Sequence, residues 1–547
     1  MREIFCNISN FLCLLLFTLP VFSQGNIHPM AGEVLLSGSF GELRATHFHS
    51  GIDIRTGGRE GLPVRVVNDG KLVRVFVSAV GYGNALYIEH PDGKMTVYGH
   101  LQRFNPEIRE MVRRFQYAEK SFYVDKNVRK ANITFKKGDI IGYSGDSGSS
   151  GGPHLHFEYR QSSTEVLLNP LRYVDIEDHI APKPITFYIY TVTADGFVKR
   201  LKAADMRQLA EKRYTSGTVE VPAGKIGIAA HVIDYMNNSS NKLGVYKMRM
   251  TVDGEKKFDY TVDSCTFSSR RLINEIKDFN LYNDNSKTVY RTFGFYLNRI
   301  PGVEAYEDGL INVATGETKK VELDFVDYAG NKSFAEIRLK GVAGNADTDF
   351  PLLRYDSNCV LTVDALSMQL GSEVLFSSVR RVARTDSLEV DDLKYKVYLT
   401  AEEEIPLMQP VRLHINGEFD DKSVIFRIND KKETKPLTTY HDAGGIYALT
   451  DMLGCYAVKS DTVAPTIELL NVRNGVLKFE IKDDFSGINT YKGEVNGEWC
   501  LFEYDAKNDI YSSSTDEPAF IKGENRVVIT VSDEVGNVTR KIFSIKL

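Results

Sequence analysis

The chain has 547 residues, of which 42% are hydrophobic and 26% charged, and its 67 Lys and Arg against 73 Asp and Glu give a net charge of −6. At roughly 150 residues per domain, this length predicts three or four domains. The composition excludes a disordered, collagenous or multi-span membrane chain. The mild acidity, without a basic stripe, also argues against a nucleic acid as partner.

The N-terminal residues predict export. The apolar run at residues 11–22 has the length of the hydrophobic part of a signal peptide and is too short to span a bilayer comfortably. We therefore expect residues 1–23 to be a signal peptide cleaved after Ser23, the alternative being a buried N-terminal helix. No later run approaches 18 apolar residues, so we expect a mature chain without a transmembrane segment, located in the periplasm or cell envelope.

Short β-rich runs separated by turns follow from Gly32 onward, with little helical periodicity. Strands are predicted at residues 71–78, 85–89 and 95–98. One helix is predicted at residues 106–116, and it opens a polar insertion at residues 102–135. We expect this insertion to cover or line a cleft.

The fold class is predicted to be mainly β, with an antiparallel first domain at residues 24–178 and about three β-sandwich, Ig-like modules after it. A Pro-rich linker precedes residue 185, and the modules are predicted at residues 185–342, 348–460 and 462–547. Related turn sequences, Asp-Tyr-Ala-Gly-Asn from Asp327 and Asp-Glu-Val-Gly-Asn from Asp533, each end a strand.

The cysteines leave two alternatives open. Without the predicted signal peptide, the chain keeps Cys265, Cys359, Cys455 and Cys500, whose spacing matches neither a zinc knuckle nor a C-x-x-C redox motif. In an exported protein these residues form disulfides or remain buried free thiols.

Histidines are concentrated near the N-terminus, where seven of the 11 lie in the first 156 residues. In a strand, His154 and His156 project to one side while the residues between and after them enter the core, and His49 and Asp53 also share a face if extended. A catalytic zinc is bound by three protein ligands, such as two imidazoles and one carboxylate, and keeps its fourth position open. A lone His-x-His is more often a surface or core pair, but the joint occurrence of these motifs favours a metal.

Residues 36–173 resemble the lysostaphin-type zinc metallopeptidases, the M23 or LytM-like family. The resemblance rests on His49-x-x-x-Asp53, Tyr-Gly-His-Leu around His100, the Lys-Gly-Asp-x-Ile-Gly at residues 137–142, and Gly-Pro-His-Leu-His-Phe-Glu around His154 and His156. It implies that His49, Asp53 and His156 bind one Zn²⁺ ion. It also implies that His100 and His154 act on the water or the transition state, and which of them is the general base stays open.

These observations predict an exported zinc endopeptidase that hydrolyses peptide cross-links of bacterial peptidoglycan. One alternative is a catalytically idle envelope scaffold or activator that binds protein partners through its β-sandwich modules. Another is a peptidase that acts on proteins or peptides other than the wall. The modules themselves carry no motif for a specific ligand, and we expect them to position the first domain or to bind wall or protein partners.

Several residues are interpreted as unrelated to catalysis. Ser147 in Gly-Asp-Ser-Gly and Ser150 in Gly-x-Ser-x-Gly match motifs of serine hydrolases, but both lie in a Gly/Ser-rich run that predicts a flexible turn. His47 is predicted to lie at the rim of the site or to contact substrate, and His90 to lie in a solvated turn. Trp499 is predicted to fill a sandwich core.

Overall fold

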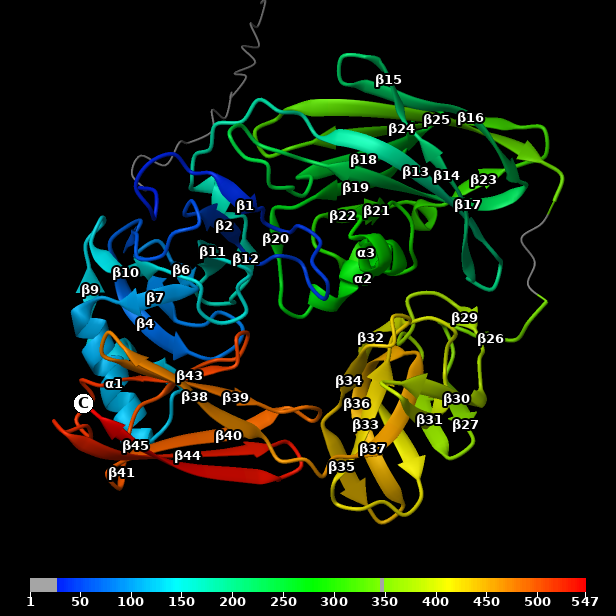
Figure 1. Ribbon diagram of the computed structural model, residues 1–547. Helices are drawn as coiled ribbons and strands as arrows, with labels where there is room; N and C mark the ends of the chain where they lie inside the picture. The colour runs from blue at the N-terminus through cyan, green and yellow to red at the C-terminus, as the bar shows by residue number, and fades with distance from the viewer. Residues whose placement is uncertain (1–26, 345–348) are drawn as a thin grey trace, which may run out of the picture.

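The computed structural model describes residues 27–344 and 349–547, and its four β-rich parts form a ring (Figure 1). The predicted signal peptide lies outside the described residues. The predicted fold class is confirmed, since strands dominate every part and helices are few and short. Within the described ranges, no helix has the length and apolar character needed to cross a membrane.

The first domain is built around a ten-stranded antiparallel sheet with a small three-stranded sheet beside it. Its elements are β1 (Leu36–Gly38), β2 (Ile52–Arg55), β3 (Pro63–Arg65), β4 (Gly70–Val77), β5 (Ala85–Glu89), β6 (Lys94–Gly99), β7 (Leu101–Phe104), α1 (Pro106–Glu119), β8 (Val124–Asn127), η1 (Arg129–Ala131), β9 (Thr134–Phe135), β10 (Ile140–Ser144), β11 (His154–Gln161), β12 (Leu167–Leu168) and η2 (Pro170–Arg172). The large sheet has the order β1-β2-β11-β6-β5-β4-β8.

The strands predicted in this domain are confirmed as β4, β5 and β6. The predicted helix is also confirmed, as α1. The Asn105 side chain caps its first turn by accepting a hydrogen bond from the Ile108 N–H at 2.9 Å. The helix ends at Glu119, three residues later than predicted, and Lys120 follows it in a left-handed conformation.

Strand β11 lies between β2 and β6 and carries the histidine motif into the middle of the large sheet. Leu155 and Phe157 are fully buried in the core on one face, as the strand alternation predicted. His156 is directly opposite Asp53 of β2 and Gly99 of β6. Burial of the apolar face therefore fixes the register that brings the polar side chains together.

The second module is a sandwich of a five-stranded sheet and a seven-stranded sheet. Its elements are β13 (Lys183–Val192), β14 (Val198–Asp205), β15 (Arg207–Ala210), β16 (Arg213–Pro222), β17 (Gly224–Ile233), β18 (Lys247–Val252), β19 (Glu255–Thr261), β20 (Ser264–Cys265), η3 (Arg270–Leu272), α2 (Ile273–Ile276), α3 (Phe279–Asn285), β21 (Val289–Arg291), η4 (Leu297–Arg299), β22 (Val303–Ala305), η5 (Glu307–Gly309), β23 (Ile311–Val313), β24 (Thr318–Val326) and β25 (Lys332–Val342). All its neighbouring strands are antiparallel except β16 and β25.

This module is continuous with the first domain. One hydrophobic cluster runs from Met30 of the first domain to Leu339 of the second module. In addition, β20 pairs with β12 and so extends the large sheet of the first domain. The two parts consequently bury apolar surface together and form one packing unit.

The third module contains two five-stranded sheets and a short two-stranded one, made of β26 (Leu352–Leu353), β27 (Cys359–Val363), β28 (Leu366–Leu370), β29 (Val379–Arg380), β30 (Arg384–Val390), β31 (Leu393–Leu399), β32 (Ile405–Asn416), β33 (Ser423–Ile428), β34 (Thr434–Pro436), β35 (Thr439–Asp442), β36 (Gly445–Leu453) and β37 (Cys455–Ser460). The last module packs two four-stranded sheets around a separate core. Its strands are β38 (Thr466–Arg473), β39 (Val476–Lys482), β40 (Ile488–Val495), β41 (Glu498–Trp499), β42 (Glu503–Asp505), β43 (Ile510–Ser514), β44 (Glu524–Asp533) and β45 (Val538–Lys546).

The last module returns to the first domain and closes the ring, as Figure 1 shows beside α1. Arg113 of α1 forms an ion pair with Glu517 at 2.8 Å, and Lys507 pairs with Asp146 at 2.6 Å. Trp499 packs edge-on against Tyr117 of α1, with ring centroids 5.0 Å apart. The prediction that Trp499 fills a sandwich core is therefore wrong, because this partly exposed indole lies at the contact between two parts of the ring.

The alternative left open for the cysteines is resolved in favour of thiols. All four described cysteines are free, with Cys265 and Cys500 buried and Cys359 and Cys455 half-buried. Burial raises the pKa of Cys265 to about 12, which keeps this thiol protonated near neutral pH.

Glu275 of α2 makes the stability of the second module dependent on pH. Its carboxyl is fully buried, and one oxygen accepts a hydrogen bond from the Tyr296 N–H at 2.7 Å while the other has no partner among the described residues. Burial raises the pKa of Glu275 from 4.5 to about 7. The protonated carboxyl therefore stabilises the fold fully below about pH 4.5, and this contribution is lost as the pH rises through 7.

We expect Glu275→Gln to increase the free energy of unfolding at pH 8 by about 2–3 kcal/mol, because the amide avoids burying a charge. At pH 4.5 the variant and the parent chain should unfold alike. Urea unfolding followed at both pH values measures the difference. An equal effect at the two pH values would contradict the assignment, since a packing change alone does not depend on pH.

Candidate metal centre

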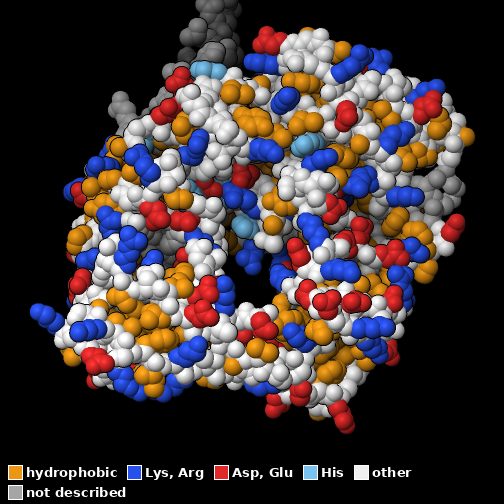
Figure 2. All heavy atoms as spheres, in the orientation of Figure 1, with side chains coloured by type: hydrophobic (Ala, Val, Ile, Leu, Met, Phe, Trp, Pro, Cys, Tyr) orange, Lys and Arg blue, Asp and Glu red, His pale blue; other side chains and the backbone are white. Residues whose placement is uncertain are grey.

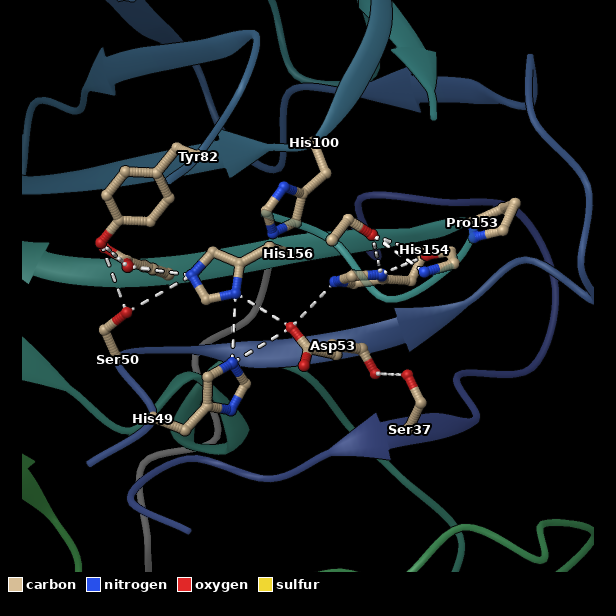
Figure 3. A network of polar contacts seen from close by, with 12 residues as sticks. Ser37, His49, Ser50, Asp53, Tyr82, His100, Pro153, His154 and His156 are labelled. Carbon is tan, nitrogen blue, oxygen red and sulfur yellow. Dashed lines mark hydrogen bonds and ion pairs between the residues drawn. The ribbon is translucent and has the colours of Figure 1, made fainter. Parts of the chain in front are cut away.

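Three side chains converge on one point at the middle of the large sheet (Figure 3). Asp53 Oδ1 lies 2.9 Å from His156 Nδ1 and 3.1 Å from His49 Nε2, and the two imidazole nitrogens are 3.2 Å apart. Asp53 and His156 come from the paired strands β2 and β11, whereas His49 lies in the loop before β2. All three side chains are buried.

Neighbouring acceptors fix the tautomer of both imidazoles. His49 Nδ1 donates to the Ser39 carbonyl at 2.8 Å, and His156 Nε2 donates to Glu158 Oε1 at 2.9 Å. In the neutral form that a metal ligand requires, these acceptors take the one proton of each ring, so His49 Nε2 and His156 Nδ1 can present lone pairs to a metal beside Asp53. Such outer contacts orient the histidine ligands of metal sites.

Glu158 is a functional residue to which the sequence analysis assigned no role. Its fully buried carboxylate accepts hydrogen bonds from Tyr82 Oη at 2.7 Å and from Arg160 Nε at 2.7 Å, besides the one from His156. Burial disfavours the charged form, but Arg160 and His156 hold the pKa of Glu158 well below its usual range. The alternation of side chains along a strand could have identified it, because Glu158 lies on the same face of β11 as His154 and His156.

Arg44 holds the other oxygen of Asp53. Its guanidinium Nη2 lies 2.7 Å from Asp53 Oδ2, which leaves Oδ1 to face the imidazoles. Burial acts to raise the pKa of Asp53, but His49 and the other neighbouring imidazoles lower it well below its ordinary value. The fully buried Lys277 of the second module donates to the carbonyls of Arg44 at 2.9 Å and Ala45 at 2.6 Å, so this module helps to position the loop that holds Asp53.

His100 and His154 lie beside the three converging residues, with their ring centroids 4.8 Å apart. His100 follows β6 with φ of 56°, an uncommon conformation for a residue with a side chain. Its Nδ1 donates to the Ser147 carbonyl at 2.8 Å, and His154 Nδ1 donates to the Gly152 carbonyl at 2.8 Å. With Nδ1 bound in this way, each ring directs its Nε2 into the site, and that of His154 lies 3.4 Å from Asp53 Oδ1.

The environment of His100 keeps it neutral. Burial and the neighbouring His156 lower the pKa of His100 to about 3. With so low a pKa, the imidazole takes up a proton at neutral pH only when the reaction itself makes that transfer favourable.

The two serines in hydrolase-like motifs support the loop at residues 145–152. Ser147 Oγ donates to the Leu101 carbonyl at 2.9 Å and accepts from the Asn84 N–H at 2.9 Å. Ser150 Oγ lies 3.2 Å from His154 Nδ1, but it donates to the Gly152 carbonyl at 2.8 Å. Their hydrogen bonds thus hold the segment whose carbonyls orient His100 and His154.

The structure also places His47 and His90, the two other histidines whose positions were predicted from the sequence. His47 is exposed near Thr46, as expected for a residue at the rim. The prediction of a solvated turn for His90 is wrong, because this imidazole is buried. It bonds to the Asp69 carbonyl and to Thr96 Oγ1, both at 2.9 Å. The contacts that bury it come from strands that are adjacent only in the folded sheet.

The geometry of the three ligands fits a zinc ion. Tetrahedral bonds of about 2.0–2.1 Å place ligand atoms about 3.3 Å apart. The three pairs of donor atoms, at 2.9, 3.1 and 3.2 Å, are close to this separation. The set of two imidazole nitrogens and one carboxylate oxygen also matches zinc better than calcium or magnesium, which prefer oxygen ligands.

We expect Glu158→Gln to weaken zinc binding by about 10–100-fold, because the amide removes the charge that holds the His156 tautomer. Titration of the metal-free chain with zinc against a competing chelator measures the affinity. Tyr82→Phe removes one neutral hydrogen bond from the same carboxylate and should weaken binding far less. Equal affinities for Glu158→Gln and the parent chain would show that the carboxylate has no influence on the metal.

The comparisons with known proteins agree with this geometry. Residues 47–122 match the profile of peptidase family M23. The chain is 31% identical over 151 residues to the DD-carboxypeptidase/endopeptidase Mpg of Neisseria gonorrhoeae, which covers 27% of this chain and 28% of that protein. It is 32% identical over 116 residues to the glycyl-glycine endopeptidase ALE-1 of Staphylococcus capitis, covering 21% of this chain and 25% of that protein.

Among solved structures, the catalytic domain of lysostaphin from Staphylococcus simulans is 26% identical, with a TM-score of 0.19, and the match covers 25% of this chain and 87% of that one. The chain thus spans about 28% of the length of the first curated relatives that it matches.

Proposed function

We propose that the chain is an exported zinc-dependent endopeptidase that hydrolyses peptide cross-links of bacterial peptidoglycan, since residues 47–122 match peptidase family M23. The observation that carries the proposal is the convergence of His49, Asp53 and His156 beside two further imidazoles. The names of the relatives, which include peptidoglycan-directed endopeptidases, support a wall peptide as the substrate. The periplasm or cell envelope is the matching location.

His49 Nε2, Asp53 Oδ1 and His156 Nδ1 would hold the zinc ion. A bound zinc supplies a Lewis acid that polarises a carbonyl and lowers the pKa of water from about 15.7 toward about 7. Arg44 keeps Asp53 ionised and oriented, and Glu158 keeps His156 in the tautomer that can bind a metal.

The two imidazoles outside the ligand set provide the proton transfers. His100 and His154 each carry their proton on Nδ1 and direct an unprotonated Nε2 into the site. Either can accept a proton from the attacking water, and in its protonated form can donate that proton to the departing amine. The other, through its unprotonated Nε2, can accept a hydrogen bond from the water or from a substrate N–H and so orient the reacting groups.

Digestion of purified peptidoglycan tests the proposal. Residues 24–547, loaded with zinc, are incubated with peptidoglycan and with isolated muropeptides, and soluble products are analysed by mass spectrometry beside a chelated sample. Newly split cross-links that are absent after chelation support the proposal and identify the bond. Intact substrates in the zinc-loaded sample contradict it. Cleavage of an unrelated peptide at the same rate would favour the broader peptidase.

The scaffold alternative has one specific observation in its favour. Lys507 of the last module pairs with Asp146, the residue before Ser147, whose carbonyl orients His100. A partner that binds the modules therefore has a structural connection to the site. If this alternative is correct, cells that carry His154→Ala, with the metal ligands intact, behave like wild type.

A further inference from the structure

Three carboxylates meet at the junction of the first domain and the second module, away from the histidine site. Asp178 precedes β13, Asp234 follows β17, and Asp327 follows β24. One oxygen from each lies within 4.8 Å of the others, and the three residues are only 8%, 3% and 2% exposed. The strand ends of two different sheets thus bring three acids from distant parts of the sequence together.

These charges have no cationic partner. Among the described residues, none of the three carboxylates forms an ion pair with Lys or Arg. Three buried negative charges at this separation repel one another strongly in a medium of low dielectric constant. The arrangement therefore requires a positive charge or a proton to compensate for it.

The hydrogen bonds around the cluster leave one oxygen free. Asp327 accepts from the Asn331 N–H at 2.8 Å and from Asn331 Nδ2 at 2.7 Å, and Asp178 Oδ1 accepts from the Ile180 N–H at 3.0 Å. In contrast, Asp234 Oδ1 is buried without any hydrogen-bond partner in the described part of the chain. A buried oxygen of this kind requires a proton, a water molecule or an ion as its partner.

A small cavity adjoins the three carboxylates. Its volume is about 30 Å³, and besides the three acids it is lined by residues that include Ser39 of the first domain and Tyr246 and Tyr328 of the second module. This space is large enough for an ion or a water molecule beside the three acids. The cavity thus lies where the unpaired oxygen and the negative charge are found.

We propose that Asp178, Asp234 and Asp327 bind one Ca²⁺ ion, which fastens the first domain to the second module. All the donors are oxygens, which suits a hard cation and does not suit zinc. Mg²⁺ usually binds through one or two carboxylates and keeps several water ligands, whereas three carboxylates converge here. Calcium accepts irregular geometry and carboxylate oxygens, and the neighbouring protein and one water can complete its coordination.

A second acidic cluster in the last module provides a matched comparison. Asp461, Asp483 and Asp533 also approach within 4.8 Å, and Asp533 begins the same turn sequence as Asp327. There, Asp461 accepts from the N–H groups of Val463 and Ser486, and Asp483, whose Oδ1 also has no hydrogen-bond partner among the described residues, is only half-buried, whereas Asp234 is 3% exposed. The proposal is confined to the first cluster.

Terbium luminescence tests the proposal, since Tb³⁺ replaces Ca²⁺ and is sensitised by nearby tyrosines such as Tyr246 and Tyr328. Residues 24–547, stripped of metal and reloaded with one equivalent of Zn²⁺, are titrated with Tb³⁺ and then with Ca²⁺. We expect one sensitised site that Ca²⁺ empties. Asp234→Asn should weaken this site about tenfold or more, because it removes one of three charged ligands. Calcium at 100 times its Kd should raise the thermal midpoint of the parent chain by roughly 5 °C but not that of the variant.

The controls separate this site from the other acidic and metal-binding groups. Asp284→Asn, an exposed residue of α3, and Asp483→Asn, in the second cluster, should leave the sensitised signal unchanged. His156→Ala should also leave it unchanged, because the histidine site is distinct. Unaltered Tb³⁺ and Ca²⁺ binding in Asp234→Asn would overturn the proposal, as would a parent chain whose thermal midpoint Ca²⁺ does not move. These readouts do not depend on peptide hydrolysis, so they stand apart from the proposed activity.

Discussion

His156→Ala is expected to abolish zinc binding and to reduce peptide hydrolysis by about 10³-fold or more, because it removes a ligand from a site of only three protein donors. The variant also leaves Glu158 without its hydrogen-bond donor from the imidazole, although Arg160 and Tyr82 still hold the carboxylate. Metal analysis should find less than one tenth of the zinc of the parent chain. Hydrolysis of muropeptides, measured at equal protein concentration, gives the activity.

His179→Ala is the matched control, because it removes an imidazole whose side chain is 74% exposed and remote from the site in the sequence. It should keep both zinc and activity. A His156→Ala variant that folds normally, as judged by circular dichroism, and still hydrolyses muropeptides at the parent rate would contradict the assignment of the site.

His154→Ala and His100→Ala are expected to retain zinc while losing about 10²–10⁴-fold in kcat, the usual contribution of a general acid or base. Neither imidazole belongs to the set of three converging donors, and each is held by a backbone carbonyl that survives the substitution. The measurement is kcat and KM for a cross-linked muropeptide, together with the zinc content of each variant. The residue that acts as the base should show the larger loss and a changed pH profile.

Ser147→Ala provides the control for these variants, because the His100 imidazole bonds to the main-chain oxygen of residue 147 and not to its side chain. Its effect on kcat should be much smaller than that of His100→Ala. Loss of zinc in His100→Ala or His154→Ala would mean that these residues bind the metal, and the separate roles proposed for them would then be incorrect.

The sequence predicted the parts of the site that depend on local periodicity. Alternation along a strand placed His154 and His156 on one face and Leu155 and Phe157 in the core, and the structure confirms this arrangement. The strand at residues 85–89 and the helix that begins at Pro106 are confirmed for the same reason. In each case, neighbours close in the sequence determine the pattern.

What the sequence did not predict depends on contacts between distant residues. Lys277 reaches the loop of Arg44 across 233 positions. His90 is buried because its imidazole meets Thr96 and the Asp69 carbonyl in the folded sheet. Trp499 packs against Tyr117 of another part of the ring. Such contacts produce no periodic pattern in the sequence, because each depends on how whole sheets are positioned relative to one another.

The surface seen in Figure 2 has Lys and Arg side chains interspersed with Asp and Glu, and it is hollowed between the parts of the ring. This mixed distribution means that no extended field of one sign on this face would direct a charged polymer toward the opening.

The closed ring has a consequence for the contact between the last module and α1. The pairs Arg113–Glu517 and Lys507–Asp146 are few and partly exposed, so they would form a weak complex between separate proteins. Here the third module tethers the two sides, and the tether keeps their local concentration in the millimolar range regardless of dilution. A single cut beside Thr462 or Val463, which are exposed between the third and last modules, would remove this covalent tether. The last module would then be held only by noncovalent contacts, such as Phe485 against Phe426 of the third module, and the face of α1 around Tyr117 would become more accessible to other proteins.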